Sequence, residues 1–278
     1  MRIPGLALVL TLVAATLCAQ TARPTASLRK AVVPIVGSAP GANGAKFKTS
    51  LRILALPGAH GRIVFHPLGA IGSDSDPTIP YSFPEDAKAT DSIQYDDVVA
   101  AMGQSGLGSL DIIPDVNGGN IFPTVITRVF NDTPNGTIGS EEQLSYPVKY
   151  FAPSTSGAQE AETFIPPMSP RFRRNVGFRT LSNISITAFI IRKDGTRVAS
   201  PFSEIGFFPG EYTAMMSVDD FAKNFMHTTI GPDDALVVLA NGTGQAIFFY
   251  TYTDNGTNDT TIAVTPPVWQ PIELRDIP

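Results

Sequence analysis

Two pairs of adjacent aspartates are the first candidates for acid–base chemistry in this chain of 278 residues. Asp96-Asp97 stands in the stretch QYDDVVAAM, and Asp219-Asp220 stands in SVDDFAKNF. Neighbouring residues of a helix point about 100 degrees apart, whereas a catalytic carboxylate pair must converge on one substrate. We therefore interpret each pair as a helix start. The first aspartate caps free backbone N–H groups, and the second lies in the first turn, where the helix dipole favours a negative charge.

Histidine and serine are the next candidates for catalysis or metal binding. The chain has three histidines, His60, His66 and His227, and none lies within four residues of another. A local metal site needs such short spacing, so we expect isolated surface or half-buried histidines. Ser105 in GQSGLG has Leu107 where a nucleophile elbow requires glycine. We predict no catalytic residue.

Two loops rich in Asp and Asn follow matching segments, FNDTPNGT at 130–137 and YTDNGTND at 252–259. Oxygen-rich loops can bind calcium, but neither loop has the alternating ligands and distal glutamate of an EF-hand. Asp and Asn also form turns in their own right. We predict no cofactor and keep calcium as the alternative. Its weak candidate ligands are Asp132, Asn135, Asp254, Asn258 and Asp259.

The N-terminus has the features of an export signal. Residues 1–19 carry a positive charge at Arg2, continue with a short apolar run and end on small Ala19, which predicts a secretory signal peptide. The alternative is a lipoprotein signal acylated at Cys18, which the bulky Leu17 disfavours. Cleavage removes the only cysteine, so the mature chain folds without disulfides. We expect a secreted or periplasmic protein, or one associated with the cell surface.

Composition argues against two classes of partner. The formal net charge is −5, which gives no electrostatic case for nucleic acid. After the signal peptide, no apolar run approaches the ~18 residues of a membrane-spanning helix. We therefore predict no transmembrane segment in the mature chain.

The second half of the sequence repeats landmarks of the first at nearly constant spacing. The pairs are Phe47 with Phe172, Phe83 with Phe208, Asp96 with Asp219, SLDII at 109–113 with ALVVL at 235–239, and VITRVFND at 125–132 with IFFYTYTD at 247–254. We predict two modules, at 31–150 and 163–278. The small, polar stretch 151–162 is the predicted linker.

Hydrophobicity within each module has a period of two, which indicates β-strands. In 47–53, Phe47, Thr49, Leu51 and Ile53 share one face, and Lys48, Ser50 and Arg52 share the other. The segment 172–179 repeats this alternation, with Arg179 outward and Arg174 as an unexplained charge on the inward face. The stretch 183–200 predicts a hairpin that turns on Asp194-Gly195, both with positive φ.

A sheet with one apolar face must cover that face with another sheet. The fold class that we predict is all-β, with two tandem β-sandwich modules of immunoglobulin-like or jelly-roll type, each with one short helix. The sequence does not choose between these connectivities.

Several stretches resemble a module found singly or in tandem in exported proteins of environmental bacteria. They are VVPIVGSAPGANGAKFKTSLRIL at 32–54, FPEDAKATDSIQYDD, GLGSLDI and TRVFNDTPNGTIG. The resemblance lies in the Pro-rich opening, the Phe-x-Thr strand and the Arg-x-x-Asn strand end, and it covers most of 31–265. It implies an exported β module and assigns no activity or site residue.

The sequence therefore favours an exported, non-catalytic binding, surface or structural protein, whose partner is an extracellular or envelope polymer or protein. The first alternative is a carbohydrate-binding module, assisted by calcium at the Asx loops. The lower alternative is a hydrolase with its site between the modules. It predicts that acidic side chains such as Asp111, Glu141, Glu142 and Glu160 meet in a pocket. The role of residues 266–278 and glycosylation at the six Asn-x-Ser/Thr patterns stay open.

Overall fold

The computed structural model of the chain describes residues 30–73, 75–115, 122–140, 143–147, 162–201, 204–241 and 244–265. These residues are mostly β-strand, arranged in antiparallel sheets, which confirms the all-β prediction. The predicted signal peptide with Cys18, nearly all of the predicted linker, the glutamates 141, 142 and 160, and the segment 266–278 lie outside the described residues.

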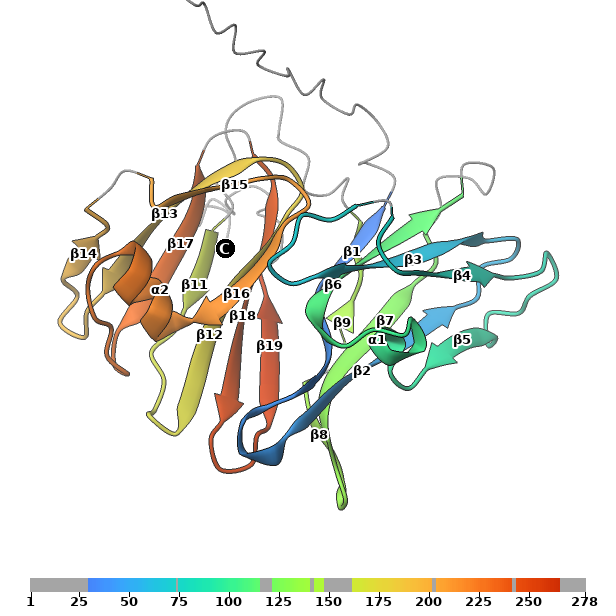
Figure 1. Cartoon of the computed structure of the whole chain (residues 1–278), viewed down its shortest axis with the longest axis horizontal. Coiled ribbons are helices and arrows are strands. Elements are labelled where there is room, and N and C mark those ends of the chain that lie inside the picture. Colours follow the sequence, from blue (N-terminus) through green and yellow to red (C-terminus); the bar gives the residue numbers. More distant parts are fainter. Residues whose placement is uncertain are drawn as a thin grey trace, which may run out of the picture.

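The N-terminal half, residues 30–147, contains a ten-stranded sheet in the order β4-β3-β6-β1-β2-β7-β8, with β10 beside β1, β5 beside β2 and β9 beside β7 (Figure 1). Its strands are β1 (Ala31–Pro40), β2 (Lys46–Leu54), β3 (His60–Pro67), β4 (Thr78–Ser82), β5 (Ser92–Tyr95), β6 (Gly106–Pro114), β7 (Val125–Thr133), β8 (Gly136–Gly139), β9 (Gln143–Leu144) and β10 (Tyr146–Pro147).

Strand β1 joins the two parts of this sheet, β4-β3-β6 on one side and β2-β7-β8 on the other. Most of its length pairs with β6, and its last residues, Ala39 and Pro40, pair with β2. One core holds side chains from both parts, such as Leu51 on β2, Phe65 on β3 and Leu110 on β6. The alternation in the sequence produces this core, because every second residue of each strand faces it.

The C-terminal half, residues 162–265, contains two sheets. The five-stranded sheet has the order β11-β17-β13-β14 with β15 beside β13, and the four-stranded sheet has the order β16-β12-β18-β19. Its strands are β11 (Glu162–Ile165), β12 (Phe172–Thr180), β13 (Ile184–Ile191), β14 (Arg197–Ala199), β15 (Gly206–Phe208), β16 (Thr213–Ser217), β17 (Ala235–Asn241), β18 (Ala246–Asp254) and β19 (Thr260–Val264). A second core joins both sheets, with Phe178 and Phe248 from one and Ile186 and Leu236 from the other.

Among the described residues, each half has one short α-helix, α1 (Val98–Ala101) or α2 (Val218–Phe225), and a 3-10 turn, η2 (Ala42–Gly44), precedes β2. The aspartate pairs do start helices, but the predicted roles are shifted. Asp97, the second aspartate, caps α1 by accepting a hydrogen bond from the N–H of Ala100. Ser217 caps α2, and both Asp219 and Asp220 lie in its first turn.

The structure explains Arg174, the charged residue on the inward face of the strand at 172–179. The Arg174 guanidinium donates to three carbonyl oxygens, those of Pro166, Gly231 and Asp234. It therefore ties together three carbonyl groups outside the strands, of which that of Gly231 also accepts from the N–H of Asp234. The hairpin of β13 and β14 is confirmed, but its turn runs from Arg192 to Thr196, and only glycine adopts positive φ there.

The two halves stand side by side (Figure 1), and β12 and β18 contact β1. Val32, Leu181 and Ile247 form a small buried apolar cluster between them, with Val264 packed against it. No helix among the described residues has the length and apolar character needed to cross a membrane.

Candidate functional site

Five charged side chains from both halves meet in one cluster, which we call the joint cluster. The N-terminal half contributes Lys30, His66 and Asp111, and the C-terminal half contributes Arg179 and Glu211. Arg179 is 0% exposed and Asp111 is 2% exposed. A buried charge without a partner is strongly destabilising, so the pairing of these groups decides what the cluster can do.

Strand alternation directs two members of the cluster to the joint. On β6, Leu110 and Ile112 point into the core of the N-terminal half, so Asp111 between them points to the opposite face. On β3, Phe65 lies in the same core, and His66 next to it faces outward. The sheet therefore presents two polar side chains on a face that the other half covers.

Arg179 reaches the joint by the same rule. Its neighbour Phe178 on β12 points into the core of the C-terminal half. The prediction that Arg179 points away from that core is confirmed, but this face is buried by the N-terminal half. Glu211 comes from the segment before β16, where its backbone has a φ of 64°, an uncommon conformation for a residue other than glycine.

Backbone and hydroxyl groups also bond across the joint. The N–H of Gly72 donates to the carbonyl of Glu211 at 2.7 Å, and the N–H of Gly69 donates to the carbonyl of Thr213 at 2.9 Å. The hydroxyls of Ser109 and Thr213 lie 2.9 Å apart. Glu211 is itself a member of the joint cluster, and Ser109 lies two residues before Asp111 on β6, so these contacts continue the charged cluster as one polar layer.

Asp111 is the centre of the cluster. Its Oδ2 accepts from Lys30 Nζ at 2.6 Å and lies 3.0 Å from His66 Nε2, while Arg179 Nη2 lies 3.2 Å from Oδ1. Burial alone raises the pKa of the Asp111 carboxyl, but the charges of Arg179 and Lys30 outweigh burial, and the pKa lies well below its usual range. The contacts with Lys30 and Arg179 therefore favour the anionic form of Asp111.

Glu211 completes the pairing. Its Oε2 accepts from Lys30 Nζ at 2.5 Å and from Arg179 Nη2 at 2.5 Å, so both cations are shared between the two carboxylates. The second terminal nitrogen of Arg179 donates to the carbonyl of Thr180 at 2.6 Å. Among the described residues, Arg179 Nε is one of two buried side-chain polar atoms without a partner. Lys30 and Arg179 thus balance the two carboxylates in charge.

His66 lies between two carboxylates. Its Nε2 faces Asp111, and its Nδ1 lies 2.6 Å from Asp76 Oδ2. Only the protonated imidazolium has N–H donors on both nitrogens. Burial lowers the pKa of His66, but the hydrogen bond and charge of Asp111, together with the hydrogen bond of Asp76, outweigh burial and raise the pKa above 6.5. The geometry and the direction of the pKa shift both indicate a charged histidine.

The ligand atoms of His66, Asp111 and Glu211 lie within 4.8 Å of one another, which is the spacing of a metal site. Each of these atoms is already occupied by Lys30, by Arg179 or by an acidic partner. A divalent cation would have to displace two buried positive charges from the same carboxylates. The chemistry of the cluster therefore fits an ion-paired joint better than a metal centre.

The prediction of three isolated histidines is wrong for His66, which is buried and bonded to two aspartates. Lys30, Arg179 and Glu211 were also missed as members of a cluster. A sequence signal exists for two residues: His66 in IVFHP and Asp111 in SLDIIP each interrupt an apolar strand. Such a residue on a strand's outward face must meet solvent or another part of the protein.

The weak calcium candidates lie in two hairpin turns, and protein donors hold several of their oxygens. Asp132 pairs with Lys48 at 2.7 Å. Asp254 accepts from two backbone N–H groups and from Arg171. The amide oxygen of Asn258 accepts from Arg173. Asn135 and Asp259 are exposed.

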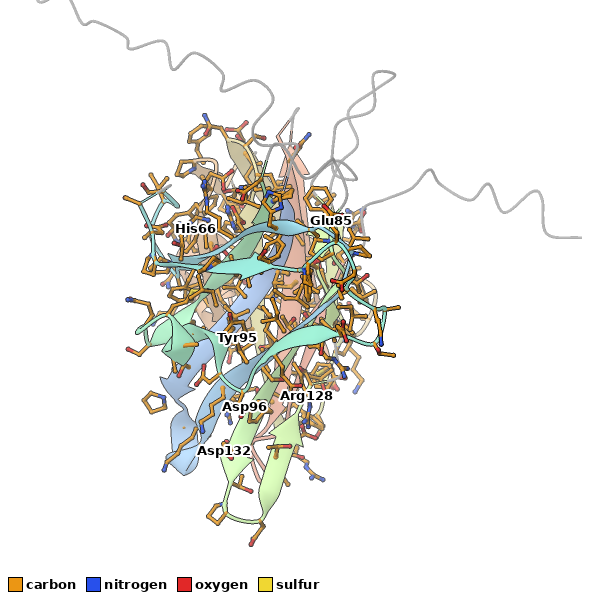
Figure 2. All side chains as sticks on the ribbon, turned by 90° about the vertical axis from the view of Figure 1, so that its right-hand side faces the viewer. His66, Glu85, Tyr95, Asp96, Arg128 and Asp132 are labelled. Carbon is orange, nitrogen blue, oxygen red and sulfur yellow. The ribbon has the colours of Figure 1, made fainter. Side chains whose placement is uncertain are left out.

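The site candidates of the N-terminal half lie in different places. Figure 2 shows His66 toward one end of this half, with Asp96 and Asp132 toward the other end. The structure therefore does not bring the aspartate pair or the Asx loop to the joint cluster. Of the four acidic residues in the hydrolase alternative, Asp111 lies in the cluster, and Glu141, Glu142 and Glu160 lie outside the described residues.

Comparisons with protein-family models, with curated proteins and with solved structures find no match for this chain.

Proposed function

We propose that this chain is an exported, non-catalytic binding, surface or structural protein, built of two tandem β-sandwich modules at 31–150 and 163–278 that the joint cluster locks into one rigid unit. The partner is an extracellular or envelope polymer or protein. The observation that carries the proposal is that the charged side chains gathered between the halves are buried and paired with one another.

Strand pairing supports the two-module part of the proposal. The order β4-β3-β6-β1 corresponds to β14-β13-β17-β11, and β5-β2-β7-β8 corresponds to β16-β12-β18-β19. The helices α1 and α2 also hold equivalent places, directly before β6 and β17. The same elements in the same chain order with the same neighbours are what a duplicated module would produce.

The pairing of the joint cluster supports a structural role for it. Separating the halves would break the contacts of Asp111 with Arg179 and of Glu211 with Lys30. It would also expose the apolar cluster around Val32 and Ile247. A joint with both features holds two modules at a fixed angle, as a protein with a long binding surface or a structural role in the envelope requires.

Export is proposed from the sequence of residues 1–19 and from the absence of cysteine after them. Cell fractionation with N-terminal sequencing of the mature protein tests this part. A mature N-terminus at Gln20 in the periplasm or medium supports it, and an intact N-terminus in the cytoplasm contradicts it.

The binding role is tested by incubating the tagged mature protein with cell envelopes and extracellular polymer from its own host. Retention of a defined polymer or protein supports the proposal. An Asp111→Asn variant is the control, because it perturbs the joint and leaves the outer surfaces unchanged. Turnover of any hydrolase substrate in the same extracts contradicts the non-catalytic assignment.

A carbohydrate-binding role remains the second candidate because aromatic side chains are exposed. Phe207 is 67% exposed, and a flat aromatic ring can stack on a sugar. It lies on β15, away from the Asx loops in the chain, so the calcium-assisted form of this role has less support. Glycan-array binding that Phe207→Ala abolishes would favour this candidate, and loss of binding in EDTA would favour its calcium-assisted form.

A further inference from the structure

The edge of β11 is open in the part of the chain that the structure describes. β11 pairs with β17 alone, whereas β1, its counterpart in the N-terminal half, pairs with β6 on one side and β10 on the other. An unpaired edge exposes backbone N–H and C=O groups to pairing with another strand. The backbone groups on this side of β11 are therefore available for pairing with a further strand.

The side chains beside this edge differ in exposure from their counterparts. Val32 pairs with Asp111, and Phe164 pairs with Val237 at the equivalent position. Val32 is 0% exposed in the joint, whereas Phe164 is 50% exposed. A large aromatic residue on an open strand edge favours an apolar occupant.

The path of the chain leads the C-terminal segment to this edge. Thr265, the last described residue, donates its hydroxyl to the Thr163 hydroxyl of β11 at 2.8 Å. Its N–H donates to the carbonyl of Phe248 at 2.9 Å. Residues 266–278, PPVWQPIELRDIP, follow directly.

In the N-terminal half the equivalent segment continues into a strand that pairs with β1. There the N–H of Ser145 donates to the carbonyl of Val125 at 2.9 Å. Val125 holds the position on β7 that Phe248 holds on β18, because Val125 pairs with Ile53 and Phe248 pairs with Phe178, the equivalent inward residues of β2 and β12. The sequence match of 125–132 with 247–254 is therefore one residue out of register. Directly after Ser145, the chain forms β10, in which Tyr146 pairs with Val32 and Pro147 pairs with Ala31.

We propose that residues 266–278 continue along the open edge of β11 in the same molecule and complete its sheet as β10 completes the sheet of the N-terminal half. The register follows from the equivalence of Ser145 and Thr265: Pro266 lies opposite Phe164, and Pro267 lies opposite Thr163. This inference rests on the proposed equivalence of the two modules.

The composition of the segment fits this place. Proline has no N–H to donate, so it is confined to edge strands in a sheet, and β10 also contains one. Opposite residues of paired strands point to the same face. In the proposed register Trp269, the only tryptophan, points to the same face as Thr163, which is the face of the core.

Paired cysteines test the register. In a Cys18→Ser background the chain has no other cysteine, so Phe164→Cys with Pro266→Cys reports one contact. Residues opposite each other in a sheet are close enough for a disulfide. The matched control is Phe207→Cys with Pro266→Cys, because Phe207 is also an exposed phenylalanine of this half.

We expect the first pair to form an intramolecular disulfide under mild oxidation at every protein concentration, and the control pair to remain reduced. Disulfide-linked dimers that increase with concentration would overturn the proposal in favour of a second copy as the occupant. Equal crosslinking of both pairs, or no crosslinking of either, would also overturn it. None of these failures touches the export and binding tests of the proposed function.

Tryptophan fluorescence gives an independent readout on the unmodified protein. We expect Trp269 to emit at short wavelength, to resist quenching by acrylamide and to shift to longer wavelength when the protein unfolds. Emission in the native protein equal to that of the unfolded chain would contradict the proposed docking.

Discussion

Replacement of Asp111 by asparagine removes the central anion of the joint cluster with almost no change in shape. Asp111 contacts Lys30, His66 and Arg179. The variant leaves Glu211 as the partner shared by both buried cations. Lys30 and Arg179 therefore keep their desolvation cost and lose part of the charge that offsets it.

Breaking a buried ion pair by removing one partner costs about 3–5 kcal/mol. Asp111 is nearly fully buried and has three charged neighbours, so we expect a loss of unfolding free energy in this range. With a slope of about 2–3 kcal/mol per molar urea, the upper part of the range for small proteins, the urea midpoint of the N-terminal half falls by about 1–2.5 M. Because the joint also weakens, the two halves are expected to unfold in two separate steps.

The assay is urea unfolding followed by circular dichroism and by tryptophan fluorescence. Asp132→Asn is the matched control, because Asp132 forms an ion pair with Lys48 in which both side chains are 40% exposed. We expect the control to keep the wild-type midpoint. The reasoning is refuted if Asp111→Asn and Asp132→Asn have the same midpoint, or if Asp111→Asn raises it.

Four smaller predictions follow from other contacts. Because the folded-state pKa of His66 is raised, its contribution to stability is full below pH 6.5 and is lost as pH rises through the raised pKa. His66→Gln removes this part of the pH dependence of the urea midpoint. A pH profile of the variant that equals the wild-type profile would contradict this role of His66. Arg174→Ala removes the donor of the Pro166 and Asp234 carbonyls and one of two donors of the Gly231 carbonyl. The variant is expected to cost about 1–3 kcal/mol, measured by urea unfolding, with Arg174→Lys giving incomplete rescue. Ser217→Ala removes the cap of α2 and is expected to cost about 1 kcal/mol; no change in thermal midpoint would argue against capping. Since Arg173 holds the amide oxygen of Asn258, millimolar calcium is expected to give the same melting temperature as EDTA, and a higher value in calcium would point to a bound ion.

The strands were predictable because their alternation is local. Leu51 and Ile53 are buried, and Lys48 and Arg52 on the other face are not buried, as a period of two requires. The helix starts were predictable in place but not in detail. Asp97 caps α1, whereas Ser217 caps α2 and its aspartate pair lies in the first turn of the helix. The sequence argument overlooked the serine.

The joint cluster was not predictable in the same way, because its members come from distant parts of the chain. Lys30 and Glu211 are 181 residues apart in sequence, and Arg179 and Asp111 are 68 apart. Alternation predicts that Arg179 points away from its own core, but it does not say whether solvent or another module lies there. Only the packing of the two halves turns an outward arginine into a fully buried one.

The same reasoning explains why His66 was expected to be isolated. Its partners Asp76 and Asp111 lie 10 and 45 residues away, outside the short spacing by which metal and catalytic histidines are sought. The available signal was a histidine within the apolar strand IVFHP. A titratable residue in such a place needs a partner on the covered face.

Amide hydrogen exchange measured by NMR tests most directly whether the two halves form one locked unit. The N–H groups of Gly69 and Gly72 donate across the joint to Thr213 and Glu211. If the joint is locked, both amides exchange as slowly as core amides such as that of Leu110, and Asp111→Asn accelerates them. Fast exchange of Gly69 and Gly72 in the unmodified protein, with slow exchange in both cores, would show that the halves separate freely and would contradict the account.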